Sequence, residues 1–249
     1  MTNQLSNTLD VLLDNYFDEF LRGNRTLNDL MPEIYSKIKY NFETDLLESL
    51  SIDWYENRNL IESYKDNINK WAIARNYQQT REITNFIGTG ALTDGKINDF
   101  LVSNKSRFNS SWLKAENRTM LQSIEMINKF ETIPNDASLM YVTASDELVR
   151  SSHKELHGLV LPKNDPQWAS LMPPPGSSPW NCRCTVVPTY SRIPSTDVVL
   201  RMERMSKIEK TTVSKMKTKI HPLKSGEMFN STDTYFKGLP KNIKGLNEI

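Results

Sequence analysis

The chain has 249 residues, of which 38% are hydrophobic and 24% charged, so it is long enough to fold around one large core or two modest ones. It contains 12 prolines and only 9 glycines, which favours helices joined by stiff, polar connections over a compact all-β barrel. No run approaches the ~20 apolar residues of a membrane span, and the N-terminus lacks the basic and apolar segments of a signal peptide.

The net charge of +1 conceals an uneven distribution of charge along the chain. Residues 1–100 hold 16 acidic and 10 basic residues, whereas residues 190–249 hold 6 acidic and 12 basic ones. The two ends are therefore expected to prefer different neighbours. The only cysteines are Cys182 and Cys184, too few for the disulfide framework of a secreted domain, so synthesis in a reducing cytoplasm is expected.

The first region, residues 1–133, is predicted to be mainly α-helical. Its apolar residues recur at spacings of three and four, as on a helix with one buried face. Gly23 and Gly88 are expected to follow helix ends, and Pro32 is expected at the start of a helix. The predicted helices cover residues 9–20, 31–50, 52–87 and 93–130.

The second region, residues 134–190, is predicted to be a small α+β module. Two β-prone runs, residues 138–143 and 185–188, flank a short helical segment and a proline-rich loop at 173–175 that is expected to be extended. One interpretation makes residues 146–157 a single helix, with Ser145 as N-cap and Gly158 as terminator. The other starts the helix near Arg150, with Asp146 in a preceding turn. The sequence does not decide between them.

The third region, residues 191–249, is predicted to be a basic, partly irregular segment, because Pro222, Gly238, Pro240 and Gly245 interrupt its helical pattern. Its cations could neutralise DNA phosphates without reading sequence, or they could simply keep the segment solvated. The candidates for DNA contact are Arg201, Arg204, Lys207, Lys210, Lys215, Lys217, Lys219 and Lys224.

Several unusual elements follow one another between residues 141 and 188. An Asp precedes a Val-Arg pair, a His-x-x-Leu-x-Gly run follows, and a loop rich in proline and tryptophan leads to Cys-Arg-Cys. This order resembles the Mu F-like minor head protein family of phages, although the family usually has proline where this chain has Ser151. The signature residues are Asp146, Arg150, His153, Leu156, Gly158, Trp168, Trp180, Cys182, Arg183 and Cys184.

The resemblance implies a minor structural protein of a tailed-phage head. It implies a few copies inside the head at the portal vertex, acting in head assembly, DNA packaging or ejection. The implied partners are the portal protein, other capsid proteins and packaged double-stranded DNA. From the residues themselves, Arg150 and Arg183 are expected to pair with Asp146 or another carboxylate, so that the helix and the Cys-Arg-Cys strand form a rigid clasp.

The histidines and cysteines of this module offer a second hypothesis, a metal-stabilised protein-binding module. His153, His157, Cys182 and Cys184 contain enough imidazole and thiol donors for a structural zinc ion. An extended Cys-x-Cys points both sulfurs to one face, which permits either chelation or simple burial. The alternative is that no cofactor is bound, both thiols are small buried groups and His153 is a hydrogen-bonded core residue.

Catalysis is poorly supported by the sequence, and the chain is not expected to be an enzyme. It has no glycine-rich phosphate loop, no Gly-x-Ser-x-Gly elbow and no His-Glu-x-x-His motif. The remaining enzymatic hypothesis is a hydrolase in which Cys182 or Cys184 is the nucleophile and His153 the base.

Overall fold

The computed structural model describes residues 2–53, 55–90, 92–173, 180–190, 194–208, 210, 234–236 and 239–240. The chain forms two compact units. The described residues of the first lie within Met1–Asp45, Lys65–Asn117 and Phe229–Ile249, and those of the second within Leu46–Tyr64 and Arg118–Met228. The sequence predicted a boundary after residue 133. The units are instead divided within three long helices, at residues 45/46, 64/65 and 117/118.

Local features of the chain end the first helix and start the second. Helix α1 (Thr2–Leu21) is followed by Gly23, whose φ of 76° is the left-handed conformation that commonly ends helices. Helix α2 (Leu27–Ser49) begins one turn earlier than predicted, so the prediction that Pro32 starts it is wrong. The reason is a capping interaction: the Thr26 backbone N–H and hydroxyl both donate to the Asp29 carboxylate, at 2.7 and 2.9 Å.

Two long helical stretches follow. Helix α3 (Arg58–Gly88) starts later than predicted, because the Asp53 carboxylate accepts hydrogen bonds from the N–H groups of Tyr55 and Glu56 and holds a turn there. The second stretch is continuous and consists of α4 (Asp94–Asn104), the π-helical segment η1 (Lys105–Trp112) and α5 (Leu113–Thr132). None of the helices in the described part of the chain has the length and apolar content needed to cross a bilayer.

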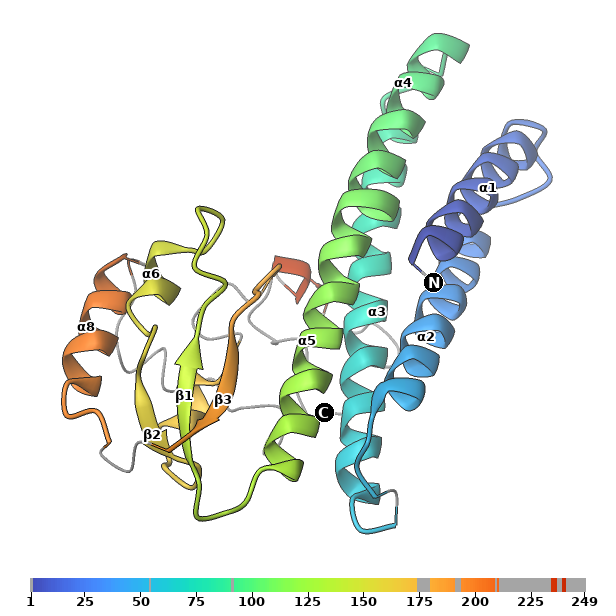
Figure 1. Ribbon diagram of the computed structural model, residues 1–249. Coiled ribbons are helices and arrows are strands. Elements are labelled where there is room, and N and C mark those ends of the chain that lie inside the picture. The colour runs from blue at the N-terminus through green and yellow to red at the C-terminus, as the bar shows by residue number, and fades with distance from the viewer. Residues whose placement is uncertain are drawn as a thin grey trace. The chain divides into compact units, whose positions relative to one another are not determined.

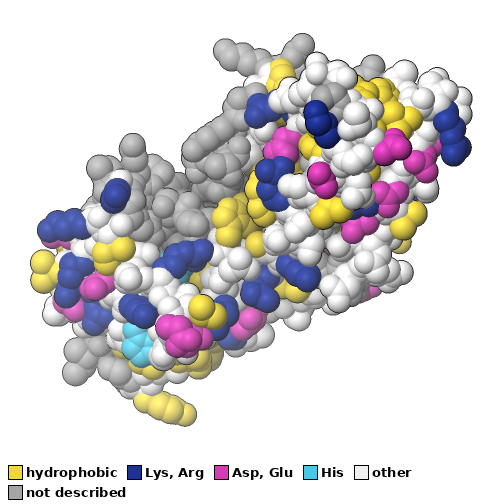
Figure 2. Space-filling model, turned by 90° about the horizontal axis from the view of Figure 1, so that it is seen from above, with side chains coloured by type: hydrophobic (Ala, Val, Ile, Leu, Met, Phe, Trp, Pro, Cys, Tyr) yellow, Lys and Arg dark blue, Asp and Glu magenta, His cyan; other side chains and the backbone are white. Residues whose placement is uncertain are grey.

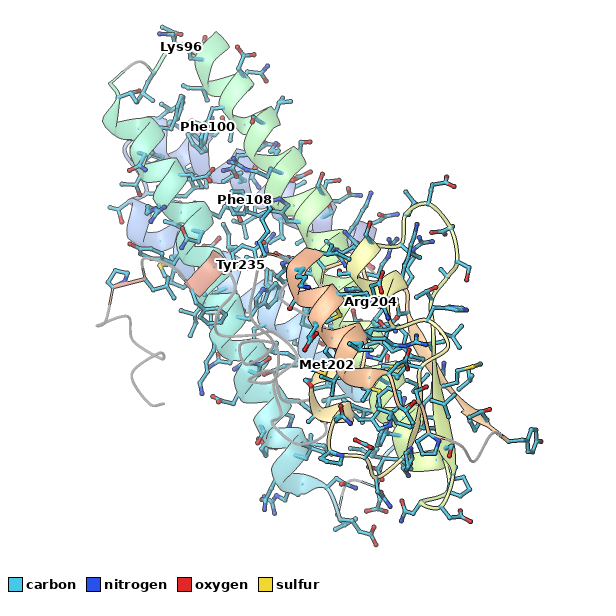
Figure 3. All side chains as sticks on the ribbon, turned by 90° about the vertical axis from the view of Figure 1, so that its left-hand side faces the viewer. Lys96, Phe100, Phe108, Met202, Arg204 and Tyr235 are labelled. Carbon is cyan, nitrogen blue, oxygen red and sulfur yellow. The ribbon has the colours of Figure 1, made fainter. Side chains whose placement is uncertain are left out.

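The first unit contains a buried polar network between α3 and the η1–α5 stretch. Arg75 donates from Nε to Glu116 at 2.9 Å and from its terminal nitrogens to Gln79 and the Phe108 carbonyl. The side chains of Arg75 and Glu116 are only 0% and 1% exposed. A short 3₁₀ turn, η2 (Thr234–Phe236), adds Tyr235 (Figure 3). Its hydroxyl donates to the other Glu116 oxygen. Burial raises the pKa of Glu116, and Arg75 and Tyr235 oppose this shift.

The second unit contains a three-stranded antiparallel sheet of order β2-β1-β3 (Figure 1). Strand β1 (Ser138–Val142) was predicted, as was β3 (Thr185–Thr189), whereas β2 (Val160–Pro162) was not. Tyr141 pairs with Val186 across β1 and β3, and both side chains are buried. The α+β class, with a mainly helical N-terminal region and a small α+β module, is confirmed.

One hydrophobic core unites the sheet with the helices of the second unit. The helices that contribute side chains to it are α5, α7 (Trp168–Leu171) and α8 (Val198–Ile208), and Leu156 is added by the turn after α6 (Ser151–Lys154). Helix α8 lies in the segment expected to be basic and partly irregular, yet three of its side chains complete this core. The buried core residues are Met126, Leu139, Tyr141, Leu156, Leu159, Leu161, Trp168, Leu171, Met172, Cys182, Cys184, Val186, Val198, Met202 and Met205.

Both outer strands of the sheet have features that oppose further backbone pairing along part of their edges. On β2, the N–H of Val160 donates to the Ser195 hydroxyl and the Val160 carbonyl accepts the Ser195 N–H, at 3.0 and 2.7 Å. Strand β3 carries Pro188 opposite Leu139, and proline has no N–H to donate.

Candidate functional site

The segment before α6 is a turn and not the first part of a helix. The Asp146 carboxylate accepts the Leu148 N–H at 3.0 Å, and Ser145 has a φ of 56°, which no helical N-cap adopts. Helix α6 begins at Ser151 with Arg150 as its extended N-cap residue, so the interpretation of residues 146–157 as one helix is wrong. The alternative, a helix starting near Arg150 after a turn, is confirmed.

Asp146 forms a two-point ion pair with Arg183. Two guanidinium nitrogens donate to the two carboxylate oxygens at 2.6 and 2.5 Å. This geometry matches the flat fork of arginine to the flat carboxylate. Hydrogen bonding from Arg183 holds the pKa of Asp146 below its ordinary value of 3.8. The expected pairing of an arginine with Asp146 is therefore confirmed for Arg183.

Arg150 makes a second connection between the same two segments. Its guanidinium donates to the backbone carbonyl of Trp180, so it does not pair with Asp146. Arg150 lies directly before α6, and Trp180 lies just before the cysteines. We call residues 146–153 together with residues 180–184 the clasp, because these contacts join two segments about thirty residues apart in the sequence.

Within the clasp, His153 lies between the two cysteines. Its Nδ1 is 3.6 Å from the sulfur of Cys182 and 3.6 Å from that of Cys184. The three residues are only 2–3% exposed. Their candidate ligand atoms all lie within 4.8 Å of one another. The prediction that the side chains of His153, Cys182 and Cys184 lie together is thus confirmed.

The two thiols influence each other strongly. A hydrogen bond between them lowers the pKa of Cys184 and raises the pKa of Cys182. Burial raises the pKa of Cys182 further. The pair therefore loses one proton more readily than an isolated thiol and the other less readily. The Tyr141 hydroxyl is buried in the same place, and its pKa is raised by burial and by both cysteines.

His157 is not part of this cluster, although it was a candidate ligand. It is exposed, and its Nδ1 accepts the Thr143 N–H at 3.2 Å and lies 3.0 Å from the Thr143 hydroxyl. The separation follows from the end of α6: Gly158, with a φ of 74°, turns the chain back to β1 and donates its N–H to the Tyr141 carbonyl. The structure thus groups three of the four predicted donors.

The remaining signature residues support the clasp from the core. Leu156 is buried in the core of the second unit, and Trp168 is buried with its indole N–H donating to the Pro162 carbonyl at 2.9 Å. Of the loop predicted to be extended, Pro174 and Pro175 lie outside the described residues. The sequence did not single out Gln122, which donates to the Cys184 carbonyl, or Lys129, which donates to the Thr185 hydroxyl at 2.6 Å.

The candidate DNA contacts divide into three groups. Arg201 donates to Asp197 and to the carbonyls of Glu155 and His157, and Arg204 pairs with Glu155 at 3.3 Å, so both have partners inside the module. Lys207 and Lys210 are exposed. On the face shown in Figure 2, cations and carboxylates of the described residues are interspersed. The last candidates, Lys215, Lys217, Lys219 and Lys224, lie outside the described residues.

Comparison with known proteins identifies relatives of this arrangement. The sequence profile of the family described as Phage Mu protein F like protein matches residues 62–187, which extends the similarity from the clasp into α3–α5. The chain is 30% identical to the Mu-like prophage FluMu F protein of Haemophilus influenzae over 134 residues, 47% of this chain and 32% of that protein.

A second relative is matched over a shorter stretch of the chain. It is an uncharacterised protein of Methanocaldococcus jannaschii, 47% identical over 51 residues, which are 20% of this chain and 7% of that protein. The chain thus spans about a third or less of the length of these two relatives. No solved structure is significantly similar to the chain.

Proposed function

Because the chain belongs to the phage Mu protein F-like family, we propose that it is a minor structural protein of a tailed-phage head, located at the portal vertex. Family membership indicates phage head morphogenesis as the general role, and a structural rather than an enzymatic one. The more specific role that we propose is in head assembly, DNA packaging or ejection. The observation that carries the proposal is the family match over half of the chain.

The geometry of the clasp supports a structural role. Its ion pair and its Arg150 hydrogen bond connect segments that are distant in the sequence, and its sulfur atoms are buried. A thiol nucleophile has to meet its substrate, whereas Cys182 and Cys184 are only 3% and 2% exposed. This burial favours a rigid connection over a Cys-His hydrolase.

The partners that we propose are the portal protein and other capsid proteins inside the head, with packaged double-stranded DNA as a further ligand of the basic segment 201–224. Folding in the host cytoplasm precedes incorporation into the head. Lys207 and Lys210 support the DNA contact because they are exposed, whereas Arg201 and Arg204 already have partners. Phosphate contacts of this kind add affinity without sequence preference.

Locating the chain in particles tests this proposal. Proheads and DNA-filled heads of the phage or induced prophage that encodes it would be purified, and the chain would be counted by quantitative mass spectrometry. We expect a few copies per head in both particles, with chemical cross-links to the portal protein. A chain that is absent from both particles would remove the head role, and cross-links to coat subunits alone would remove the portal location.

A further inference from the structure

We propose that His153, Cys182 and Cys184 bind one zinc ion that stabilises the clasp. The donor set is an imidazole and two thiols, the ligands that zinc accepts in its structural sites. All three side chains are almost completely buried and come from two segments of one compact unit. This inference is independent of the head role, since a phage head protein can fold with or without a metal.

The two nitrogen–sulfur distances in the cluster fit a tetrahedral ion. Zinc bonds of about 2.3 Å to sulfur and about 2.0 Å to nitrogen, at a tetrahedral angle, place nitrogen and sulfur about 3.5 Å apart. The two observed separations between His153 Nδ1 and the cysteine sulfurs are both 3.6 Å. One nitrogen at nearly equal distances from two sulfurs is the arrangement that a shared ion requires.

The backbone and the ion pair hold the two sulfurs on the same side. Along residues 182–184 the side chains are buried, exposed and buried in turn, as expected for an extended segment. Arg183 points away from the cluster to Asp146, which fixes the orientation of Cys182 and Cys184 toward His153. Asn181 has a φ of 57°, a conformation that asparagine tolerates well, and it starts this extended segment.

The imidazole ring has no other polar contact that explains its position. His153 Nε2 is buried without a hydrogen-bond partner among the described residues, so the cysteines are what the ring faces. The chain supplies three ligands, and a water molecule or the buried Tyr141 hydroxyl would complete the fourth position. Because the sulfurs are buried, the ion would enter during folding and would stabilise the folded state.

The same distances also suit hydrogen bonds between protonated thiols and imidazole, so the metal has to be measured directly. Full-length protein without a histidine tag would be purified under reducing conditions, and its zinc content determined by plasma mass spectrometry. We expect about one zinc per chain. Zinc-free protein titrated with Co²⁺ should then develop the intense thiolate charge-transfer bands and the visible bands of a four-coordinate cobalt site, with an end point near one equivalent.

Variants separate the cluster from the nearby histidine. Cys182→Ser, Cys184→Ser and His153→Gln should each reduce bound zinc from about one per chain to nearly none. His157→Gln is the matched control, since it removes an exposed imidazole four residues away, and it should retain the zinc. If a cysteine variant fails to fold, the Co²⁺ titration of the unmodified chain still decides the question.

Two results would overturn the proposal. One is unmodified protein that contains no zinc and gives no thiolate band with Co²⁺, in which case the three residues are a hydrogen-bonded core cluster or, if the thiols are oxidised, a redox pair. The other is zinc that persists at full stoichiometry when both Cys182 and Cys184 are serine.

Discussion

Arg183 and Asp146 bind each other through two parallel hydrogen bonds, although 37 residues separate them in the sequence. This pair holds the strand that enters β3 against the turn that leads into α6. Because Arg183 stands between the two cysteines, the pair also decides which side of that strand faces the core. The carboxylate at position 146 therefore influences the cysteines without touching them.

Removing that carboxylate should destabilise the protein in a pH-dependent manner. The pKa of Asp146 is lowered in the folded state, chiefly by the hydrogen bonds from Arg183, so its contribution exists above the ordinary value of 3.8 and is lost as pH falls through the lower folded value. Asp146→Asn should therefore melt earlier than the unmodified chain at neutral pH, and the difference should shrink below about pH 4. Thermal unfolding followed by circular dichroism measures both.

The control for this prediction is Asp136→Asn, which changes an exposed carboxylate in the loop before β1. It should leave the melting temperature nearly unchanged at both pH values. A difference between Asp146→Asn and the unmodified chain that stays constant down to about pH 2 would mean that the ion pair does not stabilise the clasp.

A side chain at position 158 should destabilise the protein, because of the backbone conformation of Gly158 alone. Its φ is 74°, and a Cβ atom built on it meets nothing within 4 Å. Gly158→Ala should therefore cost about 1 kcal/mol of unfolding free energy through strain and without a steric clash. Gly95→Ala, in helix α4, is the matched control because it too has open space but no positive φ, and it should be neutral or slightly stabilising. Equal destabilisation of the two variants in urea unfolding would refute the strain argument.

The buried ion pair of the first unit should behave as a unit under mutation. Arg75→Met leaves Glu116 buried with Tyr235 as its remaining polar side-chain partner, and it should cost about 3–5 kcal/mol. The double variant Arg75→Met with Glu116→Leu removes both charges and should recover much of that stability. Denaturant unfolding of the two single variants and the double variant gives the coupling energy, and additive effects would show that the two residues are not coupled.

Tyr235 should stabilise the first unit from near the other end of the chain. Its ring lies 5.7 Å from that of Trp112 and 6.5 Å from that of Trp71, and its hydroxyl donates to Glu116. Tyr235→Phe keeps the ring contacts but removes a hydrogen bond to a buried carboxylate, so a destabilisation of about 1–3 kcal/mol is expected. Tyr190→Phe changes a fully exposed tyrosine and should have no effect. The prediction fails if the two variants unfold at the same urea concentration.

The basic segment 201–224 should bind DNA through its lysines rather than through Arg201 and Arg204, which already have partners. Replacing Lys207, Lys210 and Lys215 by glutamine should weaken DNA retention and flatten its salt dependence, by up to about 0.9 in log–log slope for each phosphate that is no longer neutralised. The control replaces three exposed lysines elsewhere, Lys37, Lys96 and Lys114, with the same change of charge. Filter binding at several salt concentrations compares them. If the salt dependence of DNA retention has the same slope in both variants, the lysines of the basic segment only keep it solvated.

The helices were the most predictable part of the fold. The three- and four-residue spacing of apolar side chains located α1 to α5, because burial of one face dominates long helices. The same periodicity could not locate their exact starts, which depend on side-chain caps such as Asp29 and Asp53. Strand β2 has only three residues, too few for any alternation to be recognised.

The site was predictable where the residues were unusual and unpredictable where the contacts were between common ones. The signature predicted that His153 meets the two cysteines and that an arginine pairs with Asp146. The sequence alone could not say whether that arginine is Arg150 or Arg183. The network around Arg75 was missed because its partners lie 33 and 41 positions away and no motif marks them. Tyr235 was missed for the same reason, because Glu116 lies 119 positions away.

The protected edges of the small sheet affect how the module can associate with other polypeptides. An open strand invites another polypeptide to extend the sheet, and repeated extension yields fibres. Here Ser195 occupies backbone groups of β2, and Pro188 withholds a donor from β3. Lateral polymerisation through backbone pairing is thereby discouraged at these positions, which favours side-chain contacts as the route by which the module would bind another polypeptide.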